Sequence, residues 1–282
     1  MQGLYLIIAA FSGSAQSVIS GFYNKKKSSP FKCGIFQSIS VMLFFAISKG
    51  FVFDFSGEMM IWAIMFGVMY MISLTSNQLA IKTGGVPLTA LVGSYSLIIP
   101  TTFAIFVYGE YPATTFYIGL LFLLVSLFFV GYPRKDKTKK QVTPLWLLWV
   151  TIAFICNGSC SLLQTHYQKL SGGLHRSEFM IVAMCVGLVG FIVASLVDKT
   201  EYEAGYRRAL MGVGTGVFNG IVNLLVMVLV GMMSPSILFP LYSGISLITS
   251  TVASRIFFKK NPDFLSYIAI GIGIVAIVLL NI

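Results

Sequence analysis

Ten apolar stretches, separated by short polar breaks, constrain this chain more than any other feature. Each has close to the ~20 residues that an α-helix needs to cross ~30 Å of hydrocarbon. They cover residues 3–23, 31–49, 59–80, 87–108, 113–132, 145–168, 178–197, 208–230, 236–257 and 263–281. Stretches this long and uniformly apolar suit helices rather than alternating strands, since backbone groups in lipid must be hydrogen-bonded within the protein. The sequence therefore predicts an all-α polytopic membrane protein with ten transmembrane helices.

Composition excludes a soluble protein. Only 10% of the 282 residues are charged and 57% are hydrophobic, whereas a soluble domain carries about 25% charged residues. The four cysteines, at positions 33, 156, 160 and 185, form no CxxC pair, so neither a metal site nor a disulfide framework is expected. We expect no cofactor. An enzyme is the least expected class, because no nucleophile–base set or carboxylate pair falls within one plausible pocket.

The polar run at residues 133–144 predicts how the chain is oriented. If the stretches alternate across a membrane, 16 of the 19 Lys and Arg fall on the side of this run. Positive residues mark the cytoplasmic side. We therefore expect a cytoplasmic run and two outward-facing termini in a plasma (inner) membrane. The first stretch has no preceding basic residue and no clear cleavage site, so it is expected to stay as a membrane helix.

The same bias explains the net charge of +10. Basic residues at helix ends follow from membrane orientation, so no nucleic-acid partner is expected. The expected partners are a small-molecule substrate and the lipid bilayer, and a second role for the basic run is contact with anionic lipid headgroups. We expect a monomer.

Residues 1–132 and 145–282 show weak internal similarity. At an offset of 150 residues Ser96 matches Ser246 and Pro112 matches Pro262, and at an offset of 145 Gly13 matches Gly158. Each half has an odd number of helices, so the second half enters the membrane from the opposite side. The sequence predicts two inverted five-helix repeats joined by the run at 133–144, an arrangement common in secondary transporters.

A short motif between the fourth and fifth stretches adds a family resemblance. Gly109 and Glu110 are followed by Pro112, and Gly119 lies early in the fifth stretch; the second half keeps Pro262 but has two lysines in place of the Gly-Glu. With ten helices in two halves, the chain resembles the EamA-type branch of the drug/metabolite transporter superfamily. That resemblance implies a central cavity lined by helices one, three, four, six, eight and nine, with helices five and ten at the repeat interface. It implies no substrate.

Neutral polar residues inside the apolar stretches are the candidates for that cavity. All nine Asp and Glu fall in breaks or at stretch ends. The related four-helix multidrug exporters use a buried glutamate whose place here is taken by Gly13, with Gly158 as its mate, so proton/cation exchange of that type is not expected. The candidate substrate-binding residues are Gln16, Tyr70, Ser73, Asn77, Ser96, Asn157, Ser161, Gln164, Asn219, Asn223, Tyr242 and Ser246.

These candidates fall on single helix stripes, which has two explanations. Small and hydroxyl side chains at such spacing let helices pack closely, and Ser or Asn often bonds across a helix interface. An amide in hydrocarbon, however, leaves donors and acceptors unsatisfied unless it finds partners or water. His166 and Lys169 lie near the outer end of the sixth helix. His166 is either an interfacial residue with a water partner or an anion-attracting or pH-sensing group.

Together these features predict a secondary transporter. We expect alternating access around a central, uncharged, polar cavity that moves a small polar metabolite of the amino-acid, nucleobase or vitamin class. The alternatives are an exporter of cationic or amphipathic drugs and amines through an aromatic cage, a channel, and a membrane scaffold or receptor without transport.

Overall fold

The computed structural model describes residues 1–23, 28–84, 89, 92–93, 95–131, 143–198, 202, 205–258 and 264–281. No strand occurs among them, so the expected all-α class is confirmed for these residues. The labelled helices are α1 (Gln2–Tyr23), α2 (Pro30–Ser48), α3 (Gly57–Gly84), α5 (Ile98–Val107), α6 (Thr114–Gly131), α7 (Pro144–Leu170), α8 (Arg176–Val197), α9 (Tyr206–Val230), α10 (Pro235–Phe258) and α11 (Phe264–Asn281).

Six of the described helices are long and apolar enough to cross a bilayer. They are α1, α2, α3, α7, α8 and α9, and two shorter apolar helices cover Ile98–Val107 and Thr114–Ser126. Large apolar side chains also remain on the outside of the bundle, such as Leu196 and Val197 at the end of α8. Helices of this length with apolar outer faces are those of a multi-pass membrane protein.

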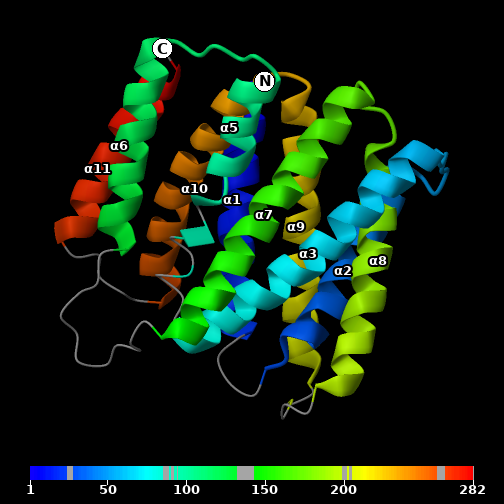
Figure 1. Cartoon of the computed structure of the whole chain (residues 1–282). Helices are drawn as coiled ribbons and strands as arrows, with labels where there is room; N and C mark the ends of the chain where they lie inside the picture. Colours follow the sequence, from blue (N-terminus) through cyan, green and yellow to red (C-terminus); the bar gives the residue numbers. More distant parts are fainter. Residues whose placement is uncertain are drawn as a thin grey trace.

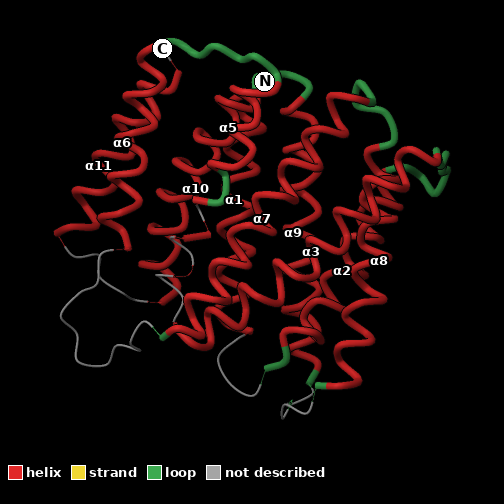
Figure 2. Tube along the Cα trace, viewed as in Figure 1, coloured by secondary structure: helices red, strands yellow, loops and turns green. Residues whose placement is uncertain are grey.

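The helices form one bundle in which partners come from distant parts of the chain. The main pairs are α3 with α7, α6 with α11, α1 with α9, and α2 with both α8 and α9. Figures 1 and 2 show the helices running side by side, with α6 and α11 at one edge and α8 at the other. Both chain termini lie at the same end of the bundle (Figure 1). We call this the terminal end.

Two apolar cores hold the bundle together. The larger is built around Phe66, Tyr167 and Phe179, which α3, α7 and α8 contribute. The second contains Leu229 and Phe239, from α9 and α10, together with residues of α1 and α6. Each core is therefore shared by residues that precede and follow the run at 133–144, so among the described residues neither of these cores belongs to one half alone. That run lies almost wholly outside the described residues.

The fourth apolar stretch differs from the expected continuous helix over 87–108. Ser96 and Leu97 form a turn, and α5 begins only at Ile98. The Ser96 hydroxyl donates to the carbonyl oxygen of Gly93 at 2.6 Å, which competes with helical bonding at this point. Pro100 lies in the first turn of α5, where a missing backbone N–H costs little. Residues 85–88 at the expected start of this stretch lie outside the described residues.

Candidate functional site

A continuous chain of hydrogen-bonded polar side chains joins four helices inside the bundle. Its members are Gln37 on α2, Tyr70 on α3, Gln164 on α7, and Asn219 and Asn223 on α9. We call this set the central polar chain. It carries no charged group, and residues from before and after the run at 133–144 contribute to it.

Tyr70 is the centre of one end of the central polar chain. The Gln37 Nε2 atom donates to the Tyr70 hydroxyl at 2.5 Å, and that hydroxyl donates to Asn219 Oδ1 at 3.4 Å. Gln37 is only 2% exposed and Tyr70 is buried. Burying an amide or hydroxyl without a partner costs about 1–3 kcal/mol in proteins, so each of these groups depends on the others.

The two asparagines of α9 connect the central polar chain to α7. Asn223 Nδ2 donates to Asn219 Oδ1 at 3.0 Å, as expected for residues four apart on one helix face. Gln164 Nε2 then donates to Asn223 Oδ1 at 3.2 Å and to its backbone oxygen at 3.3 Å. Gln164 is buried, whereas both asparagines are half-buried. The asparagines are therefore the members of the chain most available to a ligand.

Glycines on α9 allow α2 to bring Gln37 within reach. A Cβ atom on Gly216 would lie 2.7 Å from the backbone oxygen of Gln37 and 2.5 Å from Ser40 Cβ, and one on Gly220 would lie 2.8 Å from the ring of Phe44. Only a residue without a side chain permits such a close approach of the two helices. The small residues and the amides of α9 thus serve different purposes: the first pack and the second bond.

A second polar contact lies where α7 meets the turn before α5. Asn157 Nδ2 donates to Ser96 Oγ at 2.7 Å, and Ser161 Oγ donates to the backbone oxygen of Asn157 at 3.3 Å. Ser96 is buried and Asn157 is exposed. Gly158 makes the contact possible, because a Cβ atom there would lie 2.7 Å from the Ser96 backbone oxygen.

The other five predicted residues are dispersed. Gln16 on α1 and Ser246 on α10 are half-buried, Ser73 is buried, and Asn77 is exposed. Tyr242 packs its hydroxyl against Gly13, where an added Cβ atom would lie 2.7 Å away. In the described part of the chain, no hydrogen bond links these five residues to the central polar chain. The structure thus brings Tyr70, Gln164, Asn219 and Asn223 together and pairs Ser96 with Asn157 and Ser161.

Gln37 was missed by the sequence prediction. The family resemblance implies no cavity role for the second helix. The signal was nonetheless present, because Gln37 is an amide inside the apolar stretch 31–49 and needs partners there for the same reason as the asparagines.

An ion pair with its neighbours lies instead at the terminal end of the bundle. Glu110 Oε1 lies 2.7 Å from Lys169 Nζ, and Glu110 Oε2 accepts a hydrogen bond of 3.0 Å from the backbone nitrogen of Ser236. The Lys169 ammonium stands 3.9 Å from the ring centroid of Tyr108, whose hydroxyl is 3.1 Å from His166 Nδ1. We call these five residues the Glu110 cluster.

The surroundings of Glu110 favour its ionised form. Burial alone would raise the pKa of its carboxyl group, but the hydrogen bonds from Lys169 and Ser236 and the positive charge of Lys169 together hold that pKa below its usual value. Burial, and then the charge of Glu110, raise the pKa of the neighbouring Tyr108 hydroxyl. The cluster therefore contains a carboxylate–ammonium pair at neutral pH.

A second ion pair lies at the same end. Glu178, in the first turn of α8, is fully buried, and its Oε1 atom lies 3.2 Å from Lys49 Nζ. The backbone nitrogen of Asp54 donates to the same oxygen at 3.4 Å. A carboxylate is favoured at a helix N-terminus by the helix dipole. This pair fastens the connection between α2 and α3 to the start of α8.

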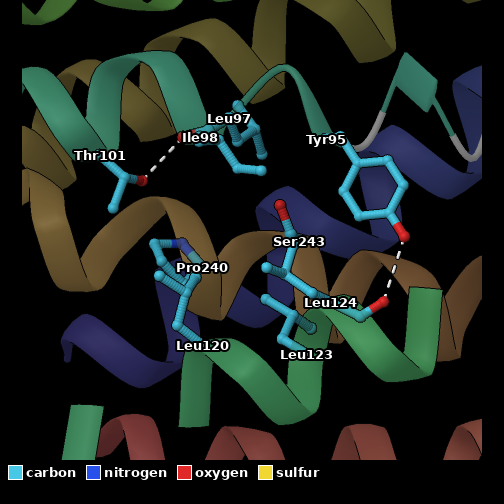
Figure 3. A pocket seen from close by; sticks show the side chains of 9 residues that line it. All are labelled: Tyr95, Leu97, Ile98, Thr101, Leu120, Leu123, Leu124, Pro240 and Ser243. Atoms are coloured by element: carbon cyan, nitrogen blue, oxygen red, sulfur yellow. Dashed lines mark hydrogen bonds between the residues drawn. The ribbon is translucent and has the colours of Figure 1, made fainter. Parts of the chain in front are cut away.

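The cavity drawn in Figure 3 is too small for a metabolite. It measures about 20 Å³ and lies among Tyr95, Thr101, Leu124, Pro240 and Ser243. That volume suits a single water molecule. The Ser243 hydroxyl is buried, has no partner among the described residues, and points from α10 toward the first turn of α5 (Figure 3).

Comparison with known proteins identifies the fold and nothing finer. No known protein family matches this chain, and no curated protein does. A solved structure described only as "Crystal structure of protein" aligns over 99% of this chain and 95% of its own, with a TM-score of 0.76 and 12% sequence identity. At that identity the likeness shows a shared fold and carries no function.

Proposed function

We propose that this protein is a secondary transporter that moves a small, polar, uncharged or zwitterionic metabolite across the plasma membrane by alternating access. The observation that carries the proposal is the central polar chain. It places amide and phenol groups, which can both donate and accept hydrogen bonds, within helices that are otherwise apolar. Polar groups at such depth are expensive and are typical of substrate pathways.

The helix pairing supports the inverted repeat on which alternating access rests. Under that repeat α1 corresponds to α7, α2 to α8, α3 to α9, α5 to α10 and α6 to α11. Exchanging the halves turns the pair α3–α7 into α9–α1 and the pair α2–α9 into α8–α3, and all four of these pairs occur. The EamA-type resemblance, the ten spans and the two outward termini belong to the same proposal.

The aromatic-cage alternative has less support. Tyr70 stacks on Phe66 with a centroid separation of 6.1 Å, and Tyr167 stacks on Phe179 at 4.9 Å. An aromatic cage needs ring faces that are open to a cation, and one face of each of these tyrosines is stacked against another ring. A hydrogen-bonded site for a neutral or zwitterionic solute is the better match.

Tyr70→Phe tests the site by removing one hydroxyl and little volume. The purified protein would be reconstituted in proteoliposomes and assayed with radiolabelled amino acids, nucleobases and water-soluble vitamins, each separately. Loss of a hydrogen bond worth about 1 kcal/mol lowers transport of the accepted compound about fivefold. Tyr95→Phe is the matched control, because the Tyr95 hydroxyl donates to the backbone oxygen of Leu124 and takes no part in the central polar chain.

The proposal fails if none of these compounds is taken up above protein-free liposomes. The proposed site is wrong if Tyr70→Phe and Tyr95→Phe transport the accepted compound at the same rate. A flux that does not saturate with substrate concentration would indicate a channel instead.

A further inference from the structure

The Glu110 cluster joins three helix ends at the terminal end of the bundle. Glu110 and Tyr108 follow α5, Lys169 and His166 lie on the last turns of α7, and Ser236 is the second residue of α10. One carboxylate thus bonds to the second half through both of its oxygens, to Lys169 at 2.7 Å and to the Ser236 nitrogen at 3.0 Å. Any motion that separates α5 from α7 and α10 must break these two bonds.

The Glu110 cluster and the central polar chain share one helix, α7. On α7, Lys169 follows Gln164 by five residues, which is about 7.5 Å along a helix axis. On α3, Tyr70 belongs to the central polar chain, while the ring of Trp62 lies 4.9 Å from that of His166. The cluster therefore lies nearer the terminal end than the central polar chain does, and α7 connects the two.

The start of α10 is built so that its first turn is weakly bonded to the rest of its helix. Pro240 lies inside α10 and has no backbone N–H. In a regular helix that N–H would donate to the carbonyl oxygen of Ser236, four residues earlier. Ser236 therefore donates its nitrogen to Glu110, while its carbonyl oxygen lacks the usual helical donor. The helix can bend between Ser236 and Pro240.

We propose that Glu110 is the latch of a gate at the terminal end, which is closed in this structure. The latch releases when its bonds to Lys169 and to the Ser236 nitrogen break. The end of α5 then separates from α7, and the first turn of α10 bends away from α5 at Pro240. This inference rests on the proposed function, since a gate has a purpose only in a transporter. A bond that serves only to cap α10 would not control the separation of α5 and α7.

Spin-label distances test the latch without any substrate. Labels would be placed at Tyr111 and Leu174, two exposed residues in the connections after α5 and α7, in a background whose four native cysteines are alanine. Glu110→Gln keeps the shape of the side chain and removes its charge, and Lys169→Met removes the partner. Each should add a longer-distance population, raising the ratio of open to closed molecules about fivefold.

Two further variants make the result specific. The double variant Glu110→Gln with Lys169→Met should give the same distribution as either single variant, because both remove one shared interaction. Lys49→Met is the matched control. It breaks the Lys49–Glu178 pair at the same end and should leave the Tyr111–Leu174 distance as in the parent protein.

Unchanged distances in both Glu110→Gln and Lys169→Met, with monodisperse folded protein, would overturn the latch. If Glu110→Gln does not fold, Lys169→Met tests the same contact. A distance change together with no transport of any compound would support the gate and overturn the proposed function. Transport that depends on Tyr70, together with unchanged distances, would support the function and overturn the latch.

Discussion

Tyr70 occupies the position where one hydroxyl meets amides from two other helices. It accepts from Gln37 and donates to Asn219, so its single O–H group is fully used. A ligand that donated a hydrogen bond to Asn219 Oδ1 would compete with Tyr70 and Asn223 for that oxygen. Ligand binding and the contact between α3 and α9 are therefore coupled through one atom.

At the residue scale, the pH dependence of stability tests the ionisation of Glu110. The depressed pKa of its carboxyl group means that the ionised form is stabilised in the folded protein. Its contribution to stability is complete above the ordinary value of 4.5 and is lost as the pH falls through the lower value in the folded state. Because the Lys169 side chain is 32% exposed, we expect that contribution to be modest, about 1 kcal/mol.

The measurement compares thermal unfolding of the native protein with that of Glu110→Gln in detergent, from pH 7 downward. The difference between their midpoints should stay constant to about pH 4.5 and then shrink. Lys169, which contacts Glu110, and His166, which contacts Tyr108, are common to both proteins. A midpoint difference that grows on acidification would contradict this assignment.

Most members of the central polar chain were predicted because amides are conspicuous in apolar segments. Asn219, Asn223 and Gln164 follow from the cost of burying an amide without partners. Which amide bonds to which was not predictable, since that depends on how four helices meet. Asn77 shows the limit, because it satisfies the same criterion on α3 and yet is exposed.

At the element scale, the contact of α9 with α2 depends on Gly216. In Gly216→Ala the new methyl group would meet the Gln37 backbone oxygen at 2.7 Å, so the helices must separate. We expect a loss of about 1–3 kcal/mol in the free energy of unfolding, as for other overpacked sites. Denaturant titration in detergent, followed by circular dichroism, measures it.

Gly214→Ala is the matched control on the same helix. A Cβ atom there would meet only Ile19 Cδ1, at the ordinary contact distance of 3.5 Å. Alanine is also the better helix former by up to about 1 kcal/mol, so this variant should be neutral or more stable. Equal losses in the two variants would show that close packing at Gly216 is not the cause.

Element boundaries were harder to predict than element type. The hydropathy of residues 87–108 predicts one crossing helix, but it does not register the turn at Ser96. That turn depends on a serine bonding back to Gly93 and on the place of Pro100. These are local bonds, which an average over ~20 residues cannot detect.

At the scale of the whole molecule, the positive-charge bias predicts which end of the bundle faces the cytoplasm. Leu174 lies at the terminal end, before α8, and Arg207 lies at the start of α9, at the opposite end. A membrane-impermeant maleimide should label Leu174→Cys in intact cells, and Arg207→Cys only after permeabilisation. The reverse pattern would invert the proposed orientation and leave the fold unchanged.

The all-helical fold was predictable because hydrocarbon leaves the backbone few choices. The pairing of the helices was not predictable, because helix faces that contact lipid and faces that contact another helix are equally apolar. Hydropathy does not distinguish the two kinds of face. The pairing of α3 with α7 rests on specific fits, such as Cys160 on α7 donating to the Phe66 backbone oxygen at 3.9 Å. Such fits are properties of the assembled bundle.

The shared central polar chain has a consequence for how the protein is made. Tyr70 and Asn219 are 149 residues apart, so at about 5–20 residues per second the ribosome needs roughly 7–30 s to supply the second after the first. During that interval Tyr70 lacks its hydrogen-bond acceptor on α9. The hydrogen bond between Gln37 and Tyr70 can form as soon as both helices are inserted. The first half therefore already contains a hydrogen-bond partner for Tyr70 before the second half is synthesised.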